Sequence, residues 1–346
     1  MTQTDARMST TTTHLGWVDH ARGIGIIAVV IGHVIRGLDS ANRIDAPSSA
    51  LLVDSIIYTW HMPLFFLLSG LFVEGSRTRR GSNGLIRSKV ATLVWPYVIW
   101  TLLQGTIQVA FGGATNTDLS AGDVLALWDP ILHFWFLYAL FFVFVLVAAA
   151  RSVGASPLLI LIGAAVLYLV ADHVDFPIPL RLVSENAVFF ALGMVVATPQ
   201  ARSLAPKLPS SSKVRLAVFA GCAMGLVVLE WFFHRSGDPR LEEHSLLAAF
   251  VAVVGVGVAV QLAMLGDRLG MRWLAKLGSH SMTIYLAHIL FASTLRVILL
   301  KLSITSFPGH VVAGVGIGLL GPMMLDVFAK RMNATWLFSA PARLIS

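Results

Sequence analysis

Long apolar stretches separated by short polar links dominate this chain. About ten of them are long enough, or nearly so, to cross the hydrocarbon layer of a membrane as helices. They fall near residues 17–36, 51–73, 90–111, 131–150, 157–171, 180–198, 214–233, 245–265, 279–300 and 311–329. The pattern predicts an all-α, polytopic membrane protein with about ten transmembrane helices around a central cavity.

The two ends of the chain lack this apolar character. Residues 1–15 are polar and rich in threonine, without the apolar core of a signal peptide, and we expect them to form a disordered cytoplasmic segment. Residues 16–330 make up the predicted transmembrane domain, and residues 331–346 a cytoplasmic tail. No link between the apolar stretches is long enough to fold as a second, soluble domain.

Composition and charge agree with a protein whose main partner is the lipid bilayer. Of the 346 residues, 56% are hydrophobic and 12% are charged, whereas a soluble domain carries about 25% charged residues. A net charge of +7 would suggest nucleic acid as the partner of a soluble protein, but here the basic residues lie in short links and indicate orientation instead. No nucleic-acid partner is therefore expected.

The basic residues are distributed unequally between the two sides of the predicted bundle. Seventeen of the 25 lysine and arginine residues lie on links of one side and six on links of the other, while Arg22 and Arg296 lie inside spans. Cytoplasmic links carry the excess of positive charge in membrane proteins. The distribution predicts that both termini are cytoplasmic.

Arg22 and His33 are the first candidate functional residues. Eleven helical residues turn through about 1100°, so the two side chains lie on one face, about 16 Å apart along the axis. A cation and an imidazole inside a membrane helix are costly, which favours a functional role. In the alternative interpretation, Arg22 only extends to the lipid headgroups and His33 is an interfacial residue. The gap between them matches the reach of the pantetheine arm of coenzyme A.

The second apolar stretch contains a histidine near its middle. His61 lies about ten residues from either end of the stretch, and Asp54, seven residues earlier, falls on nearly the same helix face. Histidines at the membrane midplane usually face a cavity. The alternative is a packing helix, kinked at Pro63, with a hydrogen-bonded histidine.

Aromatic and histidine pairs occur in two later stretches. Trp135 and Tyr138 stand at i and i+3 and are candidates for a sugar-binding wall, although an interfacial aromatic belt is the alternative. Tyr285 and His288 have the same spacing, and the apolar context predicts that His288 is buried. No metal site is predicted, because His61, His133 and His288 lack a metal-ligand spacing.

Several motifs in sequence order resemble the acyltransferase 3 family of integral membrane acyltransferases. Arg22 and His33 meet the family pattern of a basic residue, ten residues and a histidine. The runs at 19–26 and 61–70 are similar to the branch that contains sugar O-acetyltransferases such as fucose 4-O-acetylases. Further landmarks are Trp95-Pro96-Tyr97 and the runs at 134–140, 189–193 and 277–288. Together they cover nearly the whole chain.

The resemblance implies transfer of an acyl group, usually acetyl from acetyl-CoA, to a hydroxyl of a cell-envelope carbohydrate in a bacterial cytoplasmic membrane. Arg22 would hold the CoA phosphates, because guanidinium pairs well with phosphate. His33 would act as general base on the acceptor hydroxyl. The further residues expected to bind the donor are His61, Arg77, Arg79 and Arg80, although topology alone also explains the three arginines. The residues expected to bind the acceptor are Asp54, Trp135, Tyr138, Tyr285 and His288.

Two other functions are compatible with parts of the pattern. Intramembrane histidine and arginine also suit a proton-coupled transporter or flippase for a polar solute or lipid-linked sugar, but the sequence shows no repeated halves of the kind common in transporters. A scaffold without chemistry is disfavoured by three separated buried histidines. In an acyltransferase, acetyl-CoA would be a substrate, no cofactor would be bound permanently, and glycan-assembly enzymes would be candidate partners.

Overall fold

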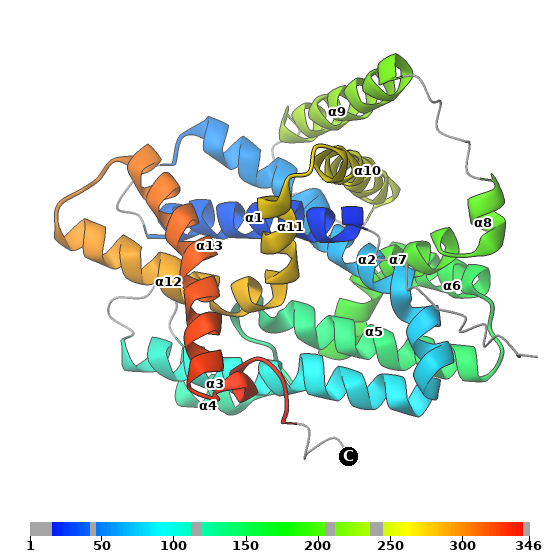
Figure 1. Cartoon of the computed structure of the whole chain (residues 1–346), viewed down its shortest axis with the longest axis horizontal. Helices are drawn as coiled ribbons and strands as arrows, with labels where there is room; N and C mark the ends of the chain where they lie inside the picture. Colours follow the sequence, from blue (N-terminus) through cyan, green and yellow to red (C-terminus); the bar gives the residue numbers. More distant parts are fainter. Residues whose placement is uncertain (1–15, 42–45, 112–118, 205–211, 236–244, 342–346) are drawn as a thin grey trace, which may run out of the picture.

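The computed structural model describes residues 16–41, 46–111, 119–204, 212–235 and 245–341, and every regular element in these ranges is helical (Figure 1). The all-α prediction is therefore confirmed. Seven helical segments of the described chain are long and apolar enough to cross a membrane. They are Gly16–Asp39, Ser48–Ala110, Leu132–Ser152, Ile178–Val196, Leu246–Arg268, Ser281–Lys301 and Phe307–Arg331. The chain is a multi-pass membrane protein.

The ten predicted stretches all fall on helices, although seven segments satisfy the length and hydropathy expected of a span. The segment Ser48–Ala110 holds two predicted stretches, because three helical elements run on without a break. Two further apolar helical stretches are shorter than a full span: Pro157–Val170, and Leu216–Phe232 within the longer helix Ser212–Arg235. Residues 1–15, predicted to be disordered, lie outside the described residues, as do residues 342–346 of the predicted tail.

The α-helices labelled in Figure 1 and three short helical elements, η1, η3 and η4, follow one another along the described chain. They are α1 (Gly16–Asp39), α2 (Ser48–Lys89), η1 (Val90–Val94), α3 (Trp95–Ala110), α4 (Ala121–Leu125), η3 (Leu132–Phe134), α5 (Trp135–Ser152), α6 (Pro157–Val170), α7 (Ile178–Val196), α8 (Pro199–Leu204), α9 (Ser212–Arg235), α10 (Leu246–Arg268), α11 (Arg272–Ser279), α12 (Ser281–Lys301), α13 (Phe307–Arg331) and η4 (Thr335–Leu337).

The helix α2 is longer than a membrane is thick. Its 42 residues correspond to about 63 Å of helix, about twice the hydrocarbon thickness. Gly81 interrupts it with φ 69° and ψ 169°, a conformation that glycine adopts without the steric cost of a side chain. Pro63 lies inside the same helix without non-helical dihedral angles, and the change of direction occurs at Gly81, in the polar part that follows the apolar stretch.

The junction between α2 and α3 reflects the sequence Trp95-Pro96. Proline lacks a backbone N–H and cannot continue the helical ladder, and the preceding residues form the π-helical turn η1, whose wider ladder accommodates the change. The indole groups of Trp95 and Trp100 then donate to the carbonyls of Trp336 and Leu337, at 2.6 and 2.7 Å. These bonds attach η4 to α3.

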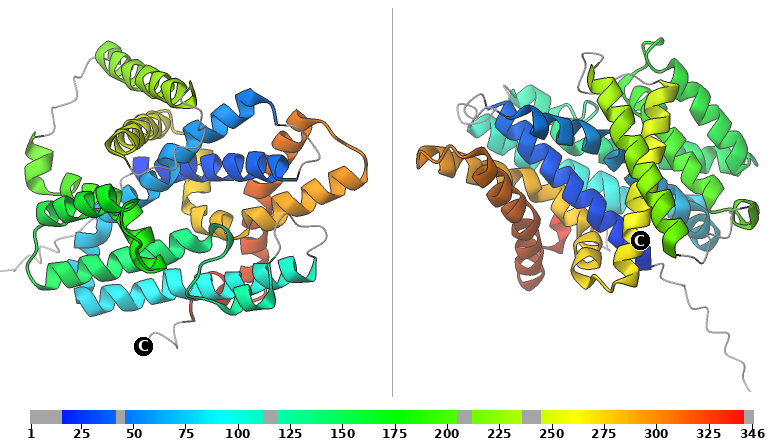
Figure 2. Two further views of the ribbon diagram at one scale, coloured as in Figure 1. Left: turned by 180° about the vertical axis from the view of Figure 1, so that it is seen from behind. Right: turned by 90° about the horizontal axis from the view of Figure 1, so that it is seen from above.

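The helix α1 is the central element of the bundle. It packs against α2, α10, α11, α12 and α13 (Figure 1), while α9 lies beside α10 at the margin (Figure 2). Gly23 of α1 and Gly278 of α11 face each other's backbones, where a Cβ atom would overlap a main-chain carbonyl. Gly70 of α2 and Gly193 of α7 form an equivalent crossing. The family-like landmarks around 61–70, 189–193 and 277–288 thus include close helix contacts.

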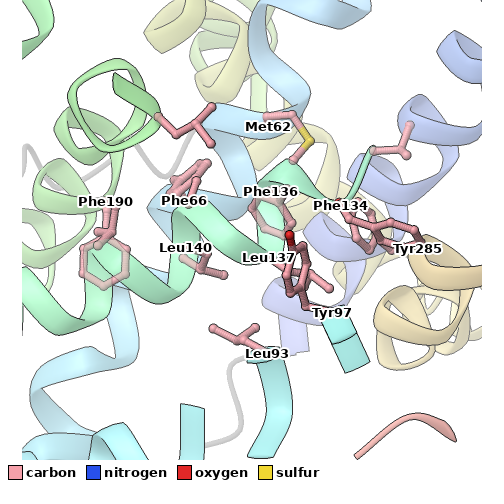
Figure 3. Packing of buried hydrophobic residues seen from close by; sticks show 14 of the residues in the cluster. Met62, Phe66, Leu93, Tyr97, Phe134, Phe136, Leu137, Leu140, Phe190 and Tyr285 are labelled. Atoms are coloured by element: carbon pink, nitrogen blue, oxygen red, sulfur yellow. The ribbon is translucent and has the colours of Figure 1, made fainter. Parts of the chain in front are cut away.

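An aromatic core joins α2, α3, α5 and α7 beside the central helix. Phe66, Phe136 and Phe190 are buried in it, and the ring centroids of Phe66 and Phe136 are 5.2 Å apart in an edge-to-face arrangement (Figure 3). Such pairs stabilise a core beyond the burial of their area. The core fixes the start of α5, and with it the position of His133, against α12.

Candidate active site

The helix α1 carries both residues of the predicted pair in one unbroken stretch. His33 lines a cavity that has a volume of about 680 Å³. Arg22 lies toward the Gly16 end of the same helix, where its Nη1 is 3.3 Å from Asp19 and 40% of its side chain is exposed. The structure therefore separates the two residues by three helical turns, as their spacing predicts.

The main cavity lies between α1, α2, α3, the start of α5, and α12. Its volume is within the range of ligand-binding pockets, which is about 300–1,000 Å³. Its polar and aromatic walls come from helices far apart in the sequence. They include His33, Arg36, Tyr58, His61, Gln104, Gln108, His133, Trp135, Tyr285, Arg296 and Lys301. Four of these, His33, His61, Trp135 and Tyr285, are among the predicted site residues.

Three imidazole rings from different elements meet at this cavity. The ring centroid of His33 is 5.0 Å from that of His288 and 5.8 Å from that of His133, and the last two are 5.0 Å apart. His33 and His133 line the cavity, whereas His288 is fully buried behind them. Within the described residues no group of three or more His, Cys, Asp or Glu side chains is arranged to hold a metal ion.

Main-chain carbonyls fix the tautomers of the surrounding histidines. His133 Nε2 lies 2.9 Å from the carbonyl of Tyr285, and His288 Nδ1 lies 2.8 Å from the same carbonyl oxygen. His61 Nδ1 lies 2.8 Å from the carbonyl of Ile57. A carbonyl only accepts, so each of these nitrogens carries a proton, and the other nitrogen of a neutral ring presents a lone pair. Of these second nitrogens, His133 Nδ1 and His288 Nε2 are buried without a hydrogen-bond partner in the described chain.

His133 belongs to the site, although the sequence pattern marked only the nearby Trp135 and Tyr138 as candidate site residues. The preceding residue, Leu132, has φ 56°, a left-handed conformation that is costly for a residue with a side chain. It turns the chain into the 3₁₀ turn η3 that carries His133. The hydroxyl of Tyr285 donates to the carbonyl of His133. Two reciprocal hydrogen bonds between His133 and Tyr285 therefore hold this ring against α12 and offset the strain at Leu132.

Arg36 is a second residue that the sequence pattern did not mark. It stands one turn beyond His33 on α1, lines the cavity, and donates from Nε to Asp54 Oδ2 at 2.9 Å. Its guanidinium carbon lies 4.0 Å from the centre of the Tyr58 ring. Asp54, predicted to bind substrate, is buried and lies outside the residues that line the cavity. Asp54 therefore orients a cationic wall residue.

The predicted aromatic pair on α5 is divided between two positions. Trp135 lines the main cavity. Tyr138 instead donates from its hydroxyl to the carbonyl of Trp128 at 3.0 Å, and its ring lies beside that of Tyr97. Tyr138 thus holds the link before α5, and Trp135 alone of the pair faces the cavity.

The arginines predicted to attract the donor lie in the polar part of α2. Arg77 pairs with Glu74 at 3.1 Å, and Arg151 of α5 pairs with the same carboxylate at 2.8 Å. Arg79 and Arg80 are exposed, and Arg80 donates to Ser88 Oγ at 2.6 Å.

Lys89 links this region to α1. Its ammonium group lies 4.2 Å over the ring of Phe144 and experiences the positive charges of Arg80 and Arg22. Arg22, Arg80 and Lys89 are therefore near enough for their charges to interact, and we call them the Arg22 basic group; none of the three lines the histidine cavity.

Comparison with known proteins shows the family to which these residues belong. The sequence model of the family described as "Acyltransferase domain" matches residues 15–327, which include the histidine cluster, Arg22 and Arg36. The chain belongs to the acyltransferase 3 family. The match extends from the start of α1 into α13, so it includes all the helices that surround the cavity.

Two curated relatives match about half of the chain. The nodulation protein NolL of Mesorhizobium japonicum is 28% identical over 188 residues, which is 52% of this chain and 47% of NolL. NolL of Sinorhizobium fredii is 27% identical over 183 residues, or 52% and 48% of the two chains. The chain thus spans about half the length of the curated relatives it matches. No solved structure matches it.

Proposed function

We propose that this protein is a membrane O-acyltransferase that moves an acetyl or other short acyl group from acyl-CoA to a hydroxyl of a cell-envelope or exported carbohydrate. The observation that carries the proposal is the placement of His33 at the wall of a cavity with polar and aromatic walls, three turns along α1 from the Arg22 basic group. Family membership supports the reaction class. The name of NolL, a nodulation protein, states no acceptor. The acceptor of this chain is therefore proposed from the chemistry of the cavity.

The two ends of α1 would receive different substrates. The excess of basic links supports an orientation in which the Arg22 end and both termini would lie on the cytoplasmic side of a bacterial membrane. Cytoplasmic acyl-CoA would bind with its phosphates at Arg22, Arg80 and Lys89, because clustered cations stabilise phosphate. The pantetheine arm would extend along α1 toward His33. The carbohydrate would enter the main cavity from the opposite side, past Arg296.

The chemical step is a direct transfer. The acceptor hydroxyl oxygen attacks the thioester carbonyl carbon while its proton moves to the lone pair of His33. A carbon–oxygen bond forms, the carbon–sulfur bond breaks, and the proton on His33 is passed to the departing CoA thiolate. Arg36, held by Asp54 at 2.9 Å, would stabilise the negative charge that develops on the carbonyl oxygen. The products are a sugar ester and free CoA, and His33 is neutral again.

The neighbouring histidines would orient rather than react. Their protonated nitrogens are committed to main-chain carbonyls, so each neutral ring keeps a lone pair on its second nitrogen. His61, which lines the same cavity with Nδ1 donating to the carbonyl of Ile57, would contact the donor thioester or the sugar. Trp135 and Tyr285 would supply the apolar walls on which a sugar ring packs.

The experiment uses purified protein in nanodiscs, which have no enclosed compartment in which transport can register. Acetyl-CoA labelled in the acetyl group is supplied with an extract of envelope glycans, and free CoA and glycan-bound label are both measured. Equal amounts of CoA and acetylated glycan support the proposal. If protein that is folded releases neither product with acetyl-CoA or longer acyl-CoA donors, the proposal is wrong, and proton-coupled uptake in proteoliposomes becomes the function to measure.

A further inference from the structure

A second cavity adjoins the first. It has a volume of about 370 Å³ and lies between α2, α6, α7, the start of α5 and the link at 129–130. Tyr58, Met62 and Trp135 line both cavities. The two spaces therefore meet at one wall, on the side of the bundle that holds the Asp39 end of α1. A molecule that reacts at His33 reaches this wall within the same cavity.

The walls of the second cavity combine apolar side chains with several polar ones. Asp129, Arg181, Glu185 and Asn186 line it, and Arg181 and Glu185 are paired at 3.9 Å. The buried Asn186 donates from Nδ2 to the carbonyl of Leu182 at 2.9 Å, so its amide is held in one orientation. A fixed amide and two carboxylates provide acceptors for hydroxyl groups, and the guanidinium provides donors. These groups disfavour an acyl chain or a lipid tail as the occupant.

Aromatic side chains also line the second cavity and the wall that it shares with the main cavity. Tyr168 lines the second cavity, and Trp135 borders both cavities. The face of an aromatic ring packs on the apolar face of a sugar, while polar groups at the edge bind its hydroxyls. Tyr58 also lies on the shared wall, beside Arg36 at 4.0 Å and with its ring 5.8 Å from that of His61. The part of the main cavity that holds Arg36 and His61 therefore shares a lining side chain, Tyr58, with the second cavity.

We infer that the second cavity binds the sugar residue next to the one that is acylated, so that the acceptor is an oligosaccharide or a glycoside rather than a free monosaccharide. The inference rests on the proposed function, because it takes His33 as the point of transfer. The acylated sugar occupies the main cavity, the glycosidic bond passes Trp135, and the adjacent sugar is held by Asp129, Arg181 and Asn186. This arrangement makes the enzyme selective for the length of its acceptor.

The test compares acceptors of different length. Mono- and disaccharide fractions are prepared by partial hydrolysis of envelope glycan and offered with labelled acetyl-CoA to the full chain in nanodiscs. The variants are Asn186→Leu, which keeps the side-chain size, and Asp129→Asn at an exposed position that does not endanger folding. The matched control is Asp175→Asn, an exposed aspartate of the α6–α7 link that lies outside both cavities. Saturation-transfer NMR without donor measures saccharide binding separately.

We expect wild-type kcat/KM to be at least tenfold higher for the disaccharide, mainly through KM, which corresponds to about 1.4 kcal/mol. Asn186→Leu and Asp129→Asn should lower the ratio of disaccharide to monosaccharide kcat/KM several-fold or more, and Asp175→Asn should keep the wild-type ratio. A wild-type ratio near one, or variants that keep that ratio, overturns the inference. If disaccharide binding weakens in Asn186→Leu but acetyl-CoA is never consumed, the saccharide cavity stands and acyl transfer is wrong.

Discussion

The contact between Asp54 and Arg36 offers a sharp test of how the cavity wall works. Asp54→Ala removes the carboxylate that receives Arg36 Nε at 2.9 Å. The carboxylate side chain is 5% exposed and the arginine side chain 32% exposed, so the carboxylate is shielded from water whereas the guanidinium is partly hydrated. A hydrogen bond between charged groups contributes about 1.5–3 kcal/mol, and the exposed third of Arg36 reduces the net loss of stability to about 1–2 kcal/mol.

The larger effect is expected on catalysis. Without Asp54, Arg36 keeps its charge and its contact with Tyr58 but loses the bond that sets its direction. Misplacing one donor to the developing oxyanion costs up to about 10²-fold in kcat. We expect Asp54→Ala to lower kcat about tenfold or more with little change in the KM for acetyl-CoA. Asp54→Asn, which keeps an acceptor oxygen, should recover part of the loss.

The assay is the rate of acetyl transfer at saturating donor, together with the melting temperature in detergent. Asp175→Asn serves as the control for removal of an acidic side chain away from the cavity. A kcat equal to that of the wild type in folded Asp54→Ala would refute the role given to Arg36. A fall in melting temperature without loss of kcat would leave Asp54 a structural residue.

Two further predictions concern the donor site and the helix crossings. Arg22→Gln should raise the KM for acetyl-CoA about tenfold or more, since a charge-assisted contact with phosphate is lost, whereas Arg331→Gln on the same side should leave it unchanged; equal KM values would remove Arg22 from donor binding. Gly193→Ala should lower the melting temperature by an amount equivalent to about 1–3 kcal/mol, because its Cβ would overlap the carbonyl of Leu67. Gly163→Ala, with nothing within 4 Å, is the control, and similar losses in both variants would contradict the crossing.

Hydropathy was sufficient to predict the helices, because a membrane span must satisfy its backbone internally and must be long and apolar. The spacing of Arg22 and His33 was also sufficient to place them on one helix at about 16 Å, since both lie in α1. The continuity of 48–110 was not predictable in the same way. Its direction changes at one glycine, Gly81, rather than at a polar loop.

The composition of the site depends on contacts between distant segments, which single-sequence patterns do not contain. His133 joins His33 and His288 because Leu132 adopts a left-handed conformation and because the carbonyl of Tyr285 accepts a hydrogen bond from the His133 ring. The periodicity that paired Trp135 with Tyr138 describes one helix face. It cannot show that the hydroxyl of Tyr138 donates to the carbonyl of Trp128 in the link before α5.

The measurement that tests the central claim most directly is transfer of labelled acetyl from acetyl-CoA to envelope glycan by His33→Ala, with His173→Ala as control. His173 is an exposed histidine of the α6–α7 link. Loss of a general base costs about 10²–10⁴-fold, so we expect glycan-bound label to fall by at least 100-fold in His33→Ala, with melting temperature retained, and to stay at the wild-type level in His173→Ala. Wild-type transfer by folded His33→Ala would contradict the account.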